Sequence, residues 1–262
     1  MKKIILVLSL VLAACAQQPT GSDSSSSGSS NPGGTAPDNE TQQRARAFTD
    51  LASAYFQRGQ YKTALDELRK AILADARYGP AYNIYGLVYM ELAEDRLAEE
   101  NFRRALELDR KASEAHNNYG WFLCTRGRYD EGQAQFTAAL QNPLYTYPEQ
   151  AMANAGMCAE KKGDLALAEA SFIRALKLQP DNPKALVKMA GLSFRKGKLT
   201  ETQRFLTRHS EIAPPTAESL WLSLRLERKL GDRAQEAAYG LQLRKRFPDS
   251  EETRLLLTGK YE

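Results

Sequence analysis

The sequence predicts an all-α fold, a right-handed superhelical solenoid of six helix-turn-helix repeats with a C-terminal capping helix. The first observation is a 34-residue frame that recurs along the chain, with one two-residue insertion between the third and fourth units. The second is a bulky residue followed by a small one at positions 7 and 8, as in Tyr119-Gly120. The third is a glycine at position 15, as in Gly127, where the chain would turn between two helices.

The repeats are defined by where each frame begins. The six units span residues 45–78, 79–112, 113–148, 149–182, 183–216 and 217–250, within a folded domain at 44–262, and residues 250–262 form the cap. Prolines such as Pro180 and Pro214 close units, because a residue without an N–H group cannot continue a helix. A short all-helical unit repeated in tandem predicts a solenoid in which each unit contacts its neighbours.

The second helix of each unit follows the frame as well. Positions 20 and 27 are mostly small and position 24 is bulky, so that two antiparallel helices can approach closely and the large side chain fills the remaining gap. This combination identifies the tetratricopeptide repeat (TPR). The last two units fit less well, as repeats near the end of a solenoid often do, with unusual residues at Thr202, His209, Leu224, Glu236 and Gly240.

The N-terminus is typical of an exported lipoprotein. Residues 1–14 combine two lysines with a nine-residue apolar run that is too short to span a bilayer. Leu12-Ala13-Ala14-Cys15 resembles the bacterial lipobox, which predicts lipid attachment at Cys15; a plain secretory signal with an incidental cysteine is the alternative. Ala16 favours the outer membrane by the sorting rule of enterobacterial lipoproteins. We expect residues 15–43, rich in Ser and Gly, to form a disordered tether.

Composition and motifs argue against catalysis and against nucleic acid. The net charge of +4 is too small to indicate nucleic-acid binding. His116 and His209 occupy slots that normally pack between helices, and no acid/base pair, nucleophile or metal motif is apparent. We therefore expect no enzyme activity, no cofactor, no metal and no small-molecule substrate. The basic residues of the fifth and sixth units are expected on a solvated face, with an acidic partner or an anionic membrane as the alternative; they are Arg195, Lys196, Lys198, Arg204, Arg208 and 244–246.

Two cysteines follow Cys15. Cys124 and Cys158 lie on the first helices of adjacent repeats, which pack side by side in a solenoid. Since the periplasm is oxidising, this placement predicts a disulfide between them, with two buried free thiols as the alternative.

The groove lined by first helices is the expected partner-binding surface. Asn83 and Asn117 share one slot in successive repeats, so their amides could bracket the backbone of an extended segment. Trp121 and Met157 would supply the apolar anchor. The alternative is that the asparagines are solvated and Trp121 packs into its neighbour. The other groove residues include Leu87, Met90, Cys124, Ala153 and Glu160. Asn118 and Asn154 are instead expected to act inside the protein, where they satisfy backbone groups between helices.

Three stretches carry a resemblance to a known family: residues 117–124, residues 142–148 and residues 154–158. Together they resemble the PilF/PilW family of type IV pilus lipoproteins. The resemblance implies an outer-membrane lipoprotein with its solenoid in the periplasm. It also implies a pilotin that helps the secretin subunit reach and assemble in the outer membrane, or a pilus-stability factor. A TPR lipoprotein of another envelope machine, such as β-barrel assembly or peptidoglycan synthesis, is the alternative.

The resemblance also covers Cys124 and Cys158, since one branch of the family has both cysteines. Gly132 departs from the usual alanine, which we expect to loosen its helix slightly.

Overall fold

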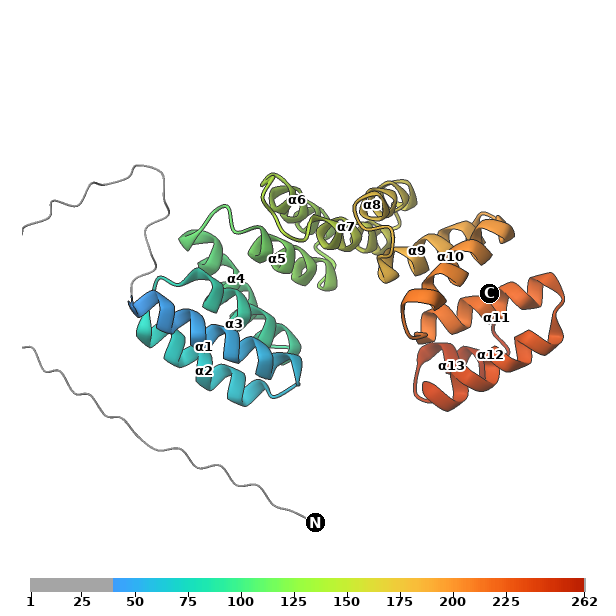
Figure 1. Ribbon diagram of the computed structural model, residues 1–262, viewed down its shortest axis with the longest axis horizontal. Coiled ribbons are helices and arrows are strands. Elements are labelled where there is room, and N and C mark those ends of the chain that lie inside the picture. The colour runs from blue at the N-terminus through green and yellow to red at the C-terminus, as the bar shows by residue number, and fades with distance from the viewer. Residues whose placement is uncertain (1–39, 262) are drawn as a thin grey trace, which may run out of the picture. The chain divides into compact units, whose positions relative to one another are not determined.

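The computed structural model describes residues 40–261, where it contains thirteen α-helices and no strand (Figure 1). Twelve of the helices form six successive pairs, and the last, α13, follows them. The predicted all-α TPR solenoid with a C-terminal helix is confirmed. The helices are α1 (Glu40–Gln57), α2 (Tyr61–Ala74), α3 (Gly79–Glu91), α4 (Asp95–Leu108), α5 (Ser113–Thr125), α6 (Tyr129–Leu140), α7 (Pro148–Lys162), α8 (Leu165–Leu178), α9 (Pro183–Arg195), α10 (Leu199–Ile212), α11 (Ala217–Leu230), α12 (Arg233–Arg246) and α13 (Glu251–Leu257).

The first helix begins earlier than the sequence indicated. Residues 40–43, expected to close the tether, are the first turn of α1. Glu40 lies in that turn, where a carboxylate interacts favourably with the positive end of the helix dipole. The expected signal peptide, Cys15 and residues 16–39 of the tether lie outside the described residues.

The two helices of each pair are joined at a residue with positive φ. Glycine occupies this place in five units, with φ between 70° and 89° at Gly59, Gly127, Gly163, Gly197 and Gly231. In the second unit Ala93 adopts φ 58°. A side chain in the left-handed region costs roughly 1 kcal/mol, so the turn geometry is imposed by the pair of helices it joins.

Close approach within a pair depends on the residue at position 8. A Cβ placed on Gly86 would lie 2.6 Å from the ring of Phe102, and one on Gly156 would lie 2.6 Å from the ring of Phe172. In the third unit the corresponding distance is 2.9 Å, to Phe136. In all three units the ring at position 24 therefore lies directly against the backbone of the first helix.

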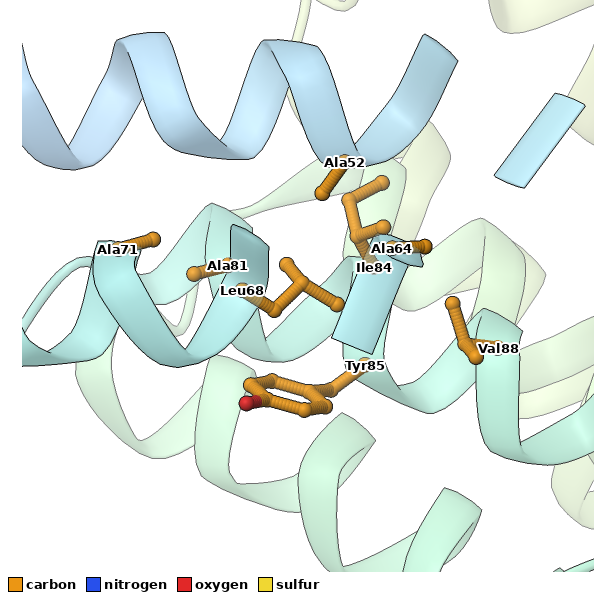
Figure 2. Close-up of a cluster of buried hydrophobic side chains, with 8 residues drawn as sticks. All are labelled: Ala52, Ala64, Leu68, Ala71, Ala81, Ile84, Tyr85 and Val88. Atoms are coloured by element: carbon orange, nitrogen blue, oxygen red, sulfur yellow. The ribbon is translucent and has the colours of Figure 1, made fainter. Parts of the chain in front are cut away.

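The first unit meets the same requirement with two aliphatic side chains. Ala52 and Leu68 occupy positions 8 and 24, and both are fully buried. Figure 2 shows that the cluster they belong to continues into α3 through Ile84 and Val88, so that the core runs from one repeat into the next. This continuity is what makes the repeats a single folded domain.

The sixth unit reverses the two sizes. Leu224 stands at position 8 and Gly240 at position 24, and a Cβ on Gly240 would lie 3.4 Å from Leu224 Cδ1. The large side chain has moved to the first helix and the small one to the second. The two residues that looked out of place singly therefore compensate as a pair, and Leu256 of α13 covers the same spot.

Helix α13 is fastened to the last repeat through Thr253. The Ser250 side chain accepts a hydrogen bond from Thr253 N at 3.2 Å, which caps the helix. The Thr253 hydroxyl donates to the carbonyl of Phe247 at 2.7 Å. Tyr261 then stacks on Trp221, with ring centroids 5.6 Å apart. The C-terminal helix thus covers apolar surface of α11 and α12.

We predict that Gly86→Ala destabilises the protein by about 1–3 kcal/mol, because the new Cβ would overlap the Phe102 ring. Urea unfolding measures the change. The matched control is Gly191→Ala in α9, where nothing lies within 4 Å of the added Cβ. That change should stabilise the protein by roughly 0.5–1 kcal/mol through helix propensity. Equal effects of the two substitutions would contradict the steric account.

Candidate functional site in the groove of first helices

Two of the predicted groove residues line one apolar cavity. Trp121 of α5 and Met157 of α7 lie on a cavity of about 480 Å³, together with Val187 of α9. Pro183, Ala213 and Pro214 supply further apolar wall. Trp121 and Met157 are half-buried, so each packs against the fold and still presents surface to the cavity. The arrangement can accept an apolar side chain of a partner.

Charged residues at the rim of this cavity are tied to one another. The Lys188 ammonium lies 2.6 Å from Glu218 and 3.4 Å from Glu160, and Glu160 also pairs with Arg195. Burial disfavours the charged form of Lys188, but the two carboxylates outweigh it and raise the pKa of the ammonium. Lys184, by contrast, has no ion pair within the described residues. Lys188 and Glu160 therefore join α7, α9 and α11, whereas Lys184 is exposed and, among residues 40–261, unpaired at the rim of the cavity.

Both histidines pack against or hydrogen-bond to other parts of the fold. His209 is 3% exposed and forms part of the cavity wall, and burial lowers its pKa although Glu218 opposes the shift. The imidazole is therefore neutral near pH 7. His116 uses both ring nitrogens inside the fold, with Nδ1 2.7 Å from Gln135 Oε1 and Nε2 3.0 Å from the Arg110 carbonyl.

The asparagines are placed differently from the expectation. Asn83 and Asn117 are only 5% and 6% exposed, and their side-chain oxygens already accept hydrogen bonds. Asn118 Nδ2 donates to Asn83 at 3.1 Å, and Asn154 Nδ2 donates to Asn117 at 2.9 Å. The prediction that Asn83 and Asn117 present their amides to a partner is corrected, because they join consecutive repeats. We call these two hydrogen bonds, Asn118 to Asn83 and Asn154 to Asn117, the asparagine ladder. Asn118 and Asn154 do act inside the protein, with side chains rather than backbone as their acceptors.

Leu87 and Met90 do not reach the apolar cavity. Both are half-buried and pack against the cluster formed around Phe122 and Leu123 of the next repeat. Their contribution is to the interface between the second and third units. Among the wall residues that the sequence reasoning missed are Val187, at position 5 of the fifth unit, and the loop residue Pro214. The frame could have indicated Val187, since position 5 is a groove slot, but not Pro214.

The structure joins Cys124 and Cys158 in a disulfide between α5 and α7. Their Cα atoms lie 5.6 Å apart, and both side chains are buried. Gly132 of α6 lies beside the bridge: an added Cβ would overlap Cys124 Sγ and lie 2.9 Å from the Gly120 carbonyl oxygen. The absent methyl group makes room for the sulfur atoms, which gives Gly132 a packing role rather than that of a weak point in its helix.

The basic residues singled out in the fifth unit are neutralised. Arg195 pairs with Glu160, Lys196 with Glu169, and Arg208 with Asp181. Lys198 and Arg204 both lie near Glu201. These side chains are exposed, so each pair contributes little to stability. Each of these five cations therefore has an acidic neighbour, although Lys198 and Arg204 share one carboxylate.

Neither a membrane crossing nor a metal centre is found between residues 40 and 261. No helix in that range has the length and apolar character that crossing a bilayer requires. No three His, Cys, Asp or Glu side chains in it come together as metal ligands would.

The tandem helix pairs and the groove along their first helices define a TPR protein, a class that binds protein partners. Tetratricopeptide repeat models match residues 45–78, 79–111, 101–134, 123–183 and 155–201. Among characterised proteins, the chain is 29% identical over 204 residues to the type IV pilus assembly protein PilF of Pseudomonas aeruginosa, covering 78% of this chain and 81% of that protein.

Two solved structures extend the comparison. The structure of Pseudomonas aeruginosa PilF has a TM-score of 0.75 and 29% identity, over 84% of this chain and 99% of that one. The crystal structure of PilW, a widely conserved type IV pilus biogenesis factor, has a TM-score of 0.71 and 33% identity, over 82% of this chain and 99% of that one. The chain belongs to the PilF/PilW family of type IV pilus biogenesis TPR proteins, and the resemblance expected from its motifs is confirmed.

We predict that Gly132→Ala destabilises the oxidised protein by about 1–3 kcal/mol, because the methyl group would overlap the disulfide. In a Cys124→Ala, Cys158→Ala background the same change should cost clearly less, since the sulfur atoms are gone. Urea unfolding of the four proteins gives the coupling energy. A coupling of zero would show that Gly132 is not needed by the bridge.

The Cys124–Cys158 disulfide should itself stabilise the folded protein. Its loop of 34 residues corresponds to about 3–4 kcal/mol on the chain-entropy estimate. A thiol count on denatured protein should rise by two when reductant is added, both where Cys15 is acylated and where it is a free thiol. An unchanged count would mean that Cys124 and Cys158 are free thiols.

Proposed function

We propose that this protein is a non-catalytic scaffold of type IV pilus biogenesis that acts as a pilotin. It binds the secretin subunit and promotes the localisation and multimerisation of the secretin in the outer membrane, or the stability of the pilus. The observation that carries the proposal is the apolar cavity at Trp121 and Met157, in a chain of the PilF/PilW family. Tryptophan and methionine are side chains that protein interfaces use as anchors.

The cavity supports capture of a short segment of the secretin subunit. Its walls come from three consecutive first helices, α5, α7 and α9, so a segment seated there would contact three repeats at once. An apolar side chain of the segment enters between Trp121, Met157 and Val187. Lys184 and Glu218 at the rim then meet polar groups on either side of it. The disulfide and the asparagine ladder hold α5 and α7 in register beneath this contact.

Anchoring is proposed to occur through Cys15, which lies outside the described residues. Acyl chains on this cysteine would hold the protein at the outer membrane with the TPR domain in the periplasm, and a multiply acylated terminus binds a bilayer much more firmly than a single chain does. The polar, Ser/Gly-rich residues that follow Cys15 would separate the lipid from α1. No observation favours β-barrel assembly or peptidoglycan synthesis, whereas PilF and PilW are both type IV pilus proteins.

We predict that Trp121→Ala combined with Met157→Ala weakens binding of the purified secretin subunit at least roughly tenfold, because the apolar anchor of the cavity is removed. Calorimetric titration measures the dissociation constant, and circular dichroism checks the fold. The matched control is Leu73→Ala with Leu144→Ala, two side chains that are 82% and 86% exposed and lie outside the cavity. Unchanged binding by the first variant would place the site elsewhere. Asn117 is left intact, since its loss would disturb the ladder.

We predict that Cys15→Ser gives a folded protein that no longer supports heat-stable secretin multimers in the outer membrane, because the lipid anchor is lost. The measurement compares outer-membrane extracts from the deletion strain, the strain complemented with the natural gene, and the strain complemented with the variant. Multimers absent from the deletion strain but normal with Cys15→Ser would remove the lipid from the mechanism. Multimers present in all three would turn the function toward pilus stability.

A further inference from the structure

A second cavity, of about 450 Å³, lies at the C-terminal ends of α9 and α11. Four basic residues line it, Arg225, Arg228, Lys229 and Arg233, together with Phe194 and Tyr261. Arg225, Arg228 and Lys229 occupy positions 9, 12 and 13 of the sixth unit, and Phe194 occupies position 12 of the fifth. These are the slots that form the partner groove in the earlier repeats. The cationic cavity therefore continues the groove that contains Trp121 and Met157.

The positive charges in this cavity exceed the acidic groups that face them. Within residues 40–261, neither Arg225 nor Lys229 has an ion pair with a carboxylate, and the buried Nε atom of Arg225 has no hydrogen-bond partner. Arg228 and Arg233 share one carboxylate, Glu236, at 2.8 and 3.0 Å. Among residues 40–261, these four cations therefore have one acidic partner between them. This differs from the fifth unit, where every basic residue singled out has an acidic neighbour.

Aromatic rings hold the arginines in place. The guanidinium of Arg225 lies 4.7 Å from the Phe194 ring centroid, and that of Arg228 lies 3.9 Å from the Tyr261 ring centroid. A guanidinium over an aromatic ring is held in place by the ring, and its N–H groups point outward in the plane of the guanidinium. Burial lowers the pKa of Arg225, and the charge of Arg195 lowers it further. A nearby anion would oppose this shift, because it favours the charged guanidinium.

The spacing of the two cavities suits one extended chain. Helices α9 and α11 contribute to both: Val187 and Glu218 line the apolar cavity, and Phe194 and Arg225 line the cationic one. Seven residues separate the two members of each pair, which corresponds to about 10 Å along a helix. An extended peptide covers that distance in about three residues.

We propose that the cationic cavity binds a carboxylate of the same partner segment whose apolar side chain fills the Trp121–Met157 cavity. The groove then selects an extended peptide in which an acidic residue, or the C-terminal carboxylate, lies about three residues from an apolar anchor. Guanidinium groups recognise carboxylates through paired, charge-assisted hydrogen bonds, and the Nε atom of Arg225 has no hydrogen-bond partner within the described part of the protein. The inference rests on the proposed function of the groove, and it adds the chemistry of the segment that the groove accepts.

Selection from a random peptide library displayed on phage tests this chemistry without using the secretin. Peptides enriched on the immobilised protein should combine an apolar residue with an acidic one about three positions away. The same selection on Arg225→Gln with Lys229→Gln should lose the acidic preference, and synthetic peptides from the first selection should bind that variant roughly tenfold more weakly. The matched control, Lys177→Gln with Lys245→Gln, also removes two positive charges, from exposed sites outside the cavity.

The outcomes separate the two proposals. Three results would overturn the carboxylate site. They are enriched peptides without an acidic residue, no enrichment at all, or an acidic preference that is as strong on the Arg225→Gln, Lys229→Gln variant as on the natural protein. Binding to phosphatidylglycerol vesicles that only the Arg225→Gln, Lys229→Gln variant loses would overturn the peptide as its occupant. Titration of the purified secretin subunit against the natural protein tests the proposed function separately. Absence of secretin binding, together with the predicted peptide preference, would refute the pilotin role and leave the carboxylate site standing.

Discussion

The contact on which this fold depends is the one between position 8 of a first helix and position 24 of the second helix in the same unit. Three units place a phenylalanine ring against a glycine backbone, so their helices lie as close as the ring allows. The first unit achieves the same with Ala52 and Leu68. Because each pair is set at a fixed spacing, the first helices of successive pairs pack side by side, and their outward slots line a groove.

The same contact explains which parts of the fold the sequence could predict. A packing requirement repeated every 34 residues leaves a periodic signal, and the frame found helix pairs, turns and the C-terminal helix. Position-by-position reasoning fails where two changes compensate. Leu224 and Gly240 each break the pattern, yet they exchange sizes across one contact. Gly132 is similar, since its lack of a side chain has meaning only beside the sulfur atoms of Cys124 and Cys158.

The groove was predicted less completely than the fold, because a slot on a helix does not decide what its side chain meets. Trp121 and Met157 share position 9 and do line one cavity. Asn83 and Asn117 share position 5, but each is met by an asparagine from the following repeat. A buried amide without a hydrogen-bond partner is costly, so the buried Asn83 and Asn117 are stable only because they are paired. The pairing ties the repeats together and leaves these amides unavailable to a partner. Pro214 enters the cavity from a loop, which no helical frame describes.

Charged residues, like the groove residues, could be identified from the sequence, but their partners could not. The chain carries 36 basic and 32 acidic residues, a balance that indicates no particular ligand. In the fifth unit the cations are matched locally, and in the sixth Arg225 and Lys229 are not. Between the two cavities, the ion pairs that join Glu218, Lys188, Glu160 and Arg195 link α11, α9 and α7. They hold α7, α9 and α11 together, and the helical rise along α9 and α11 then sets the distance between the apolar and cationic cavities.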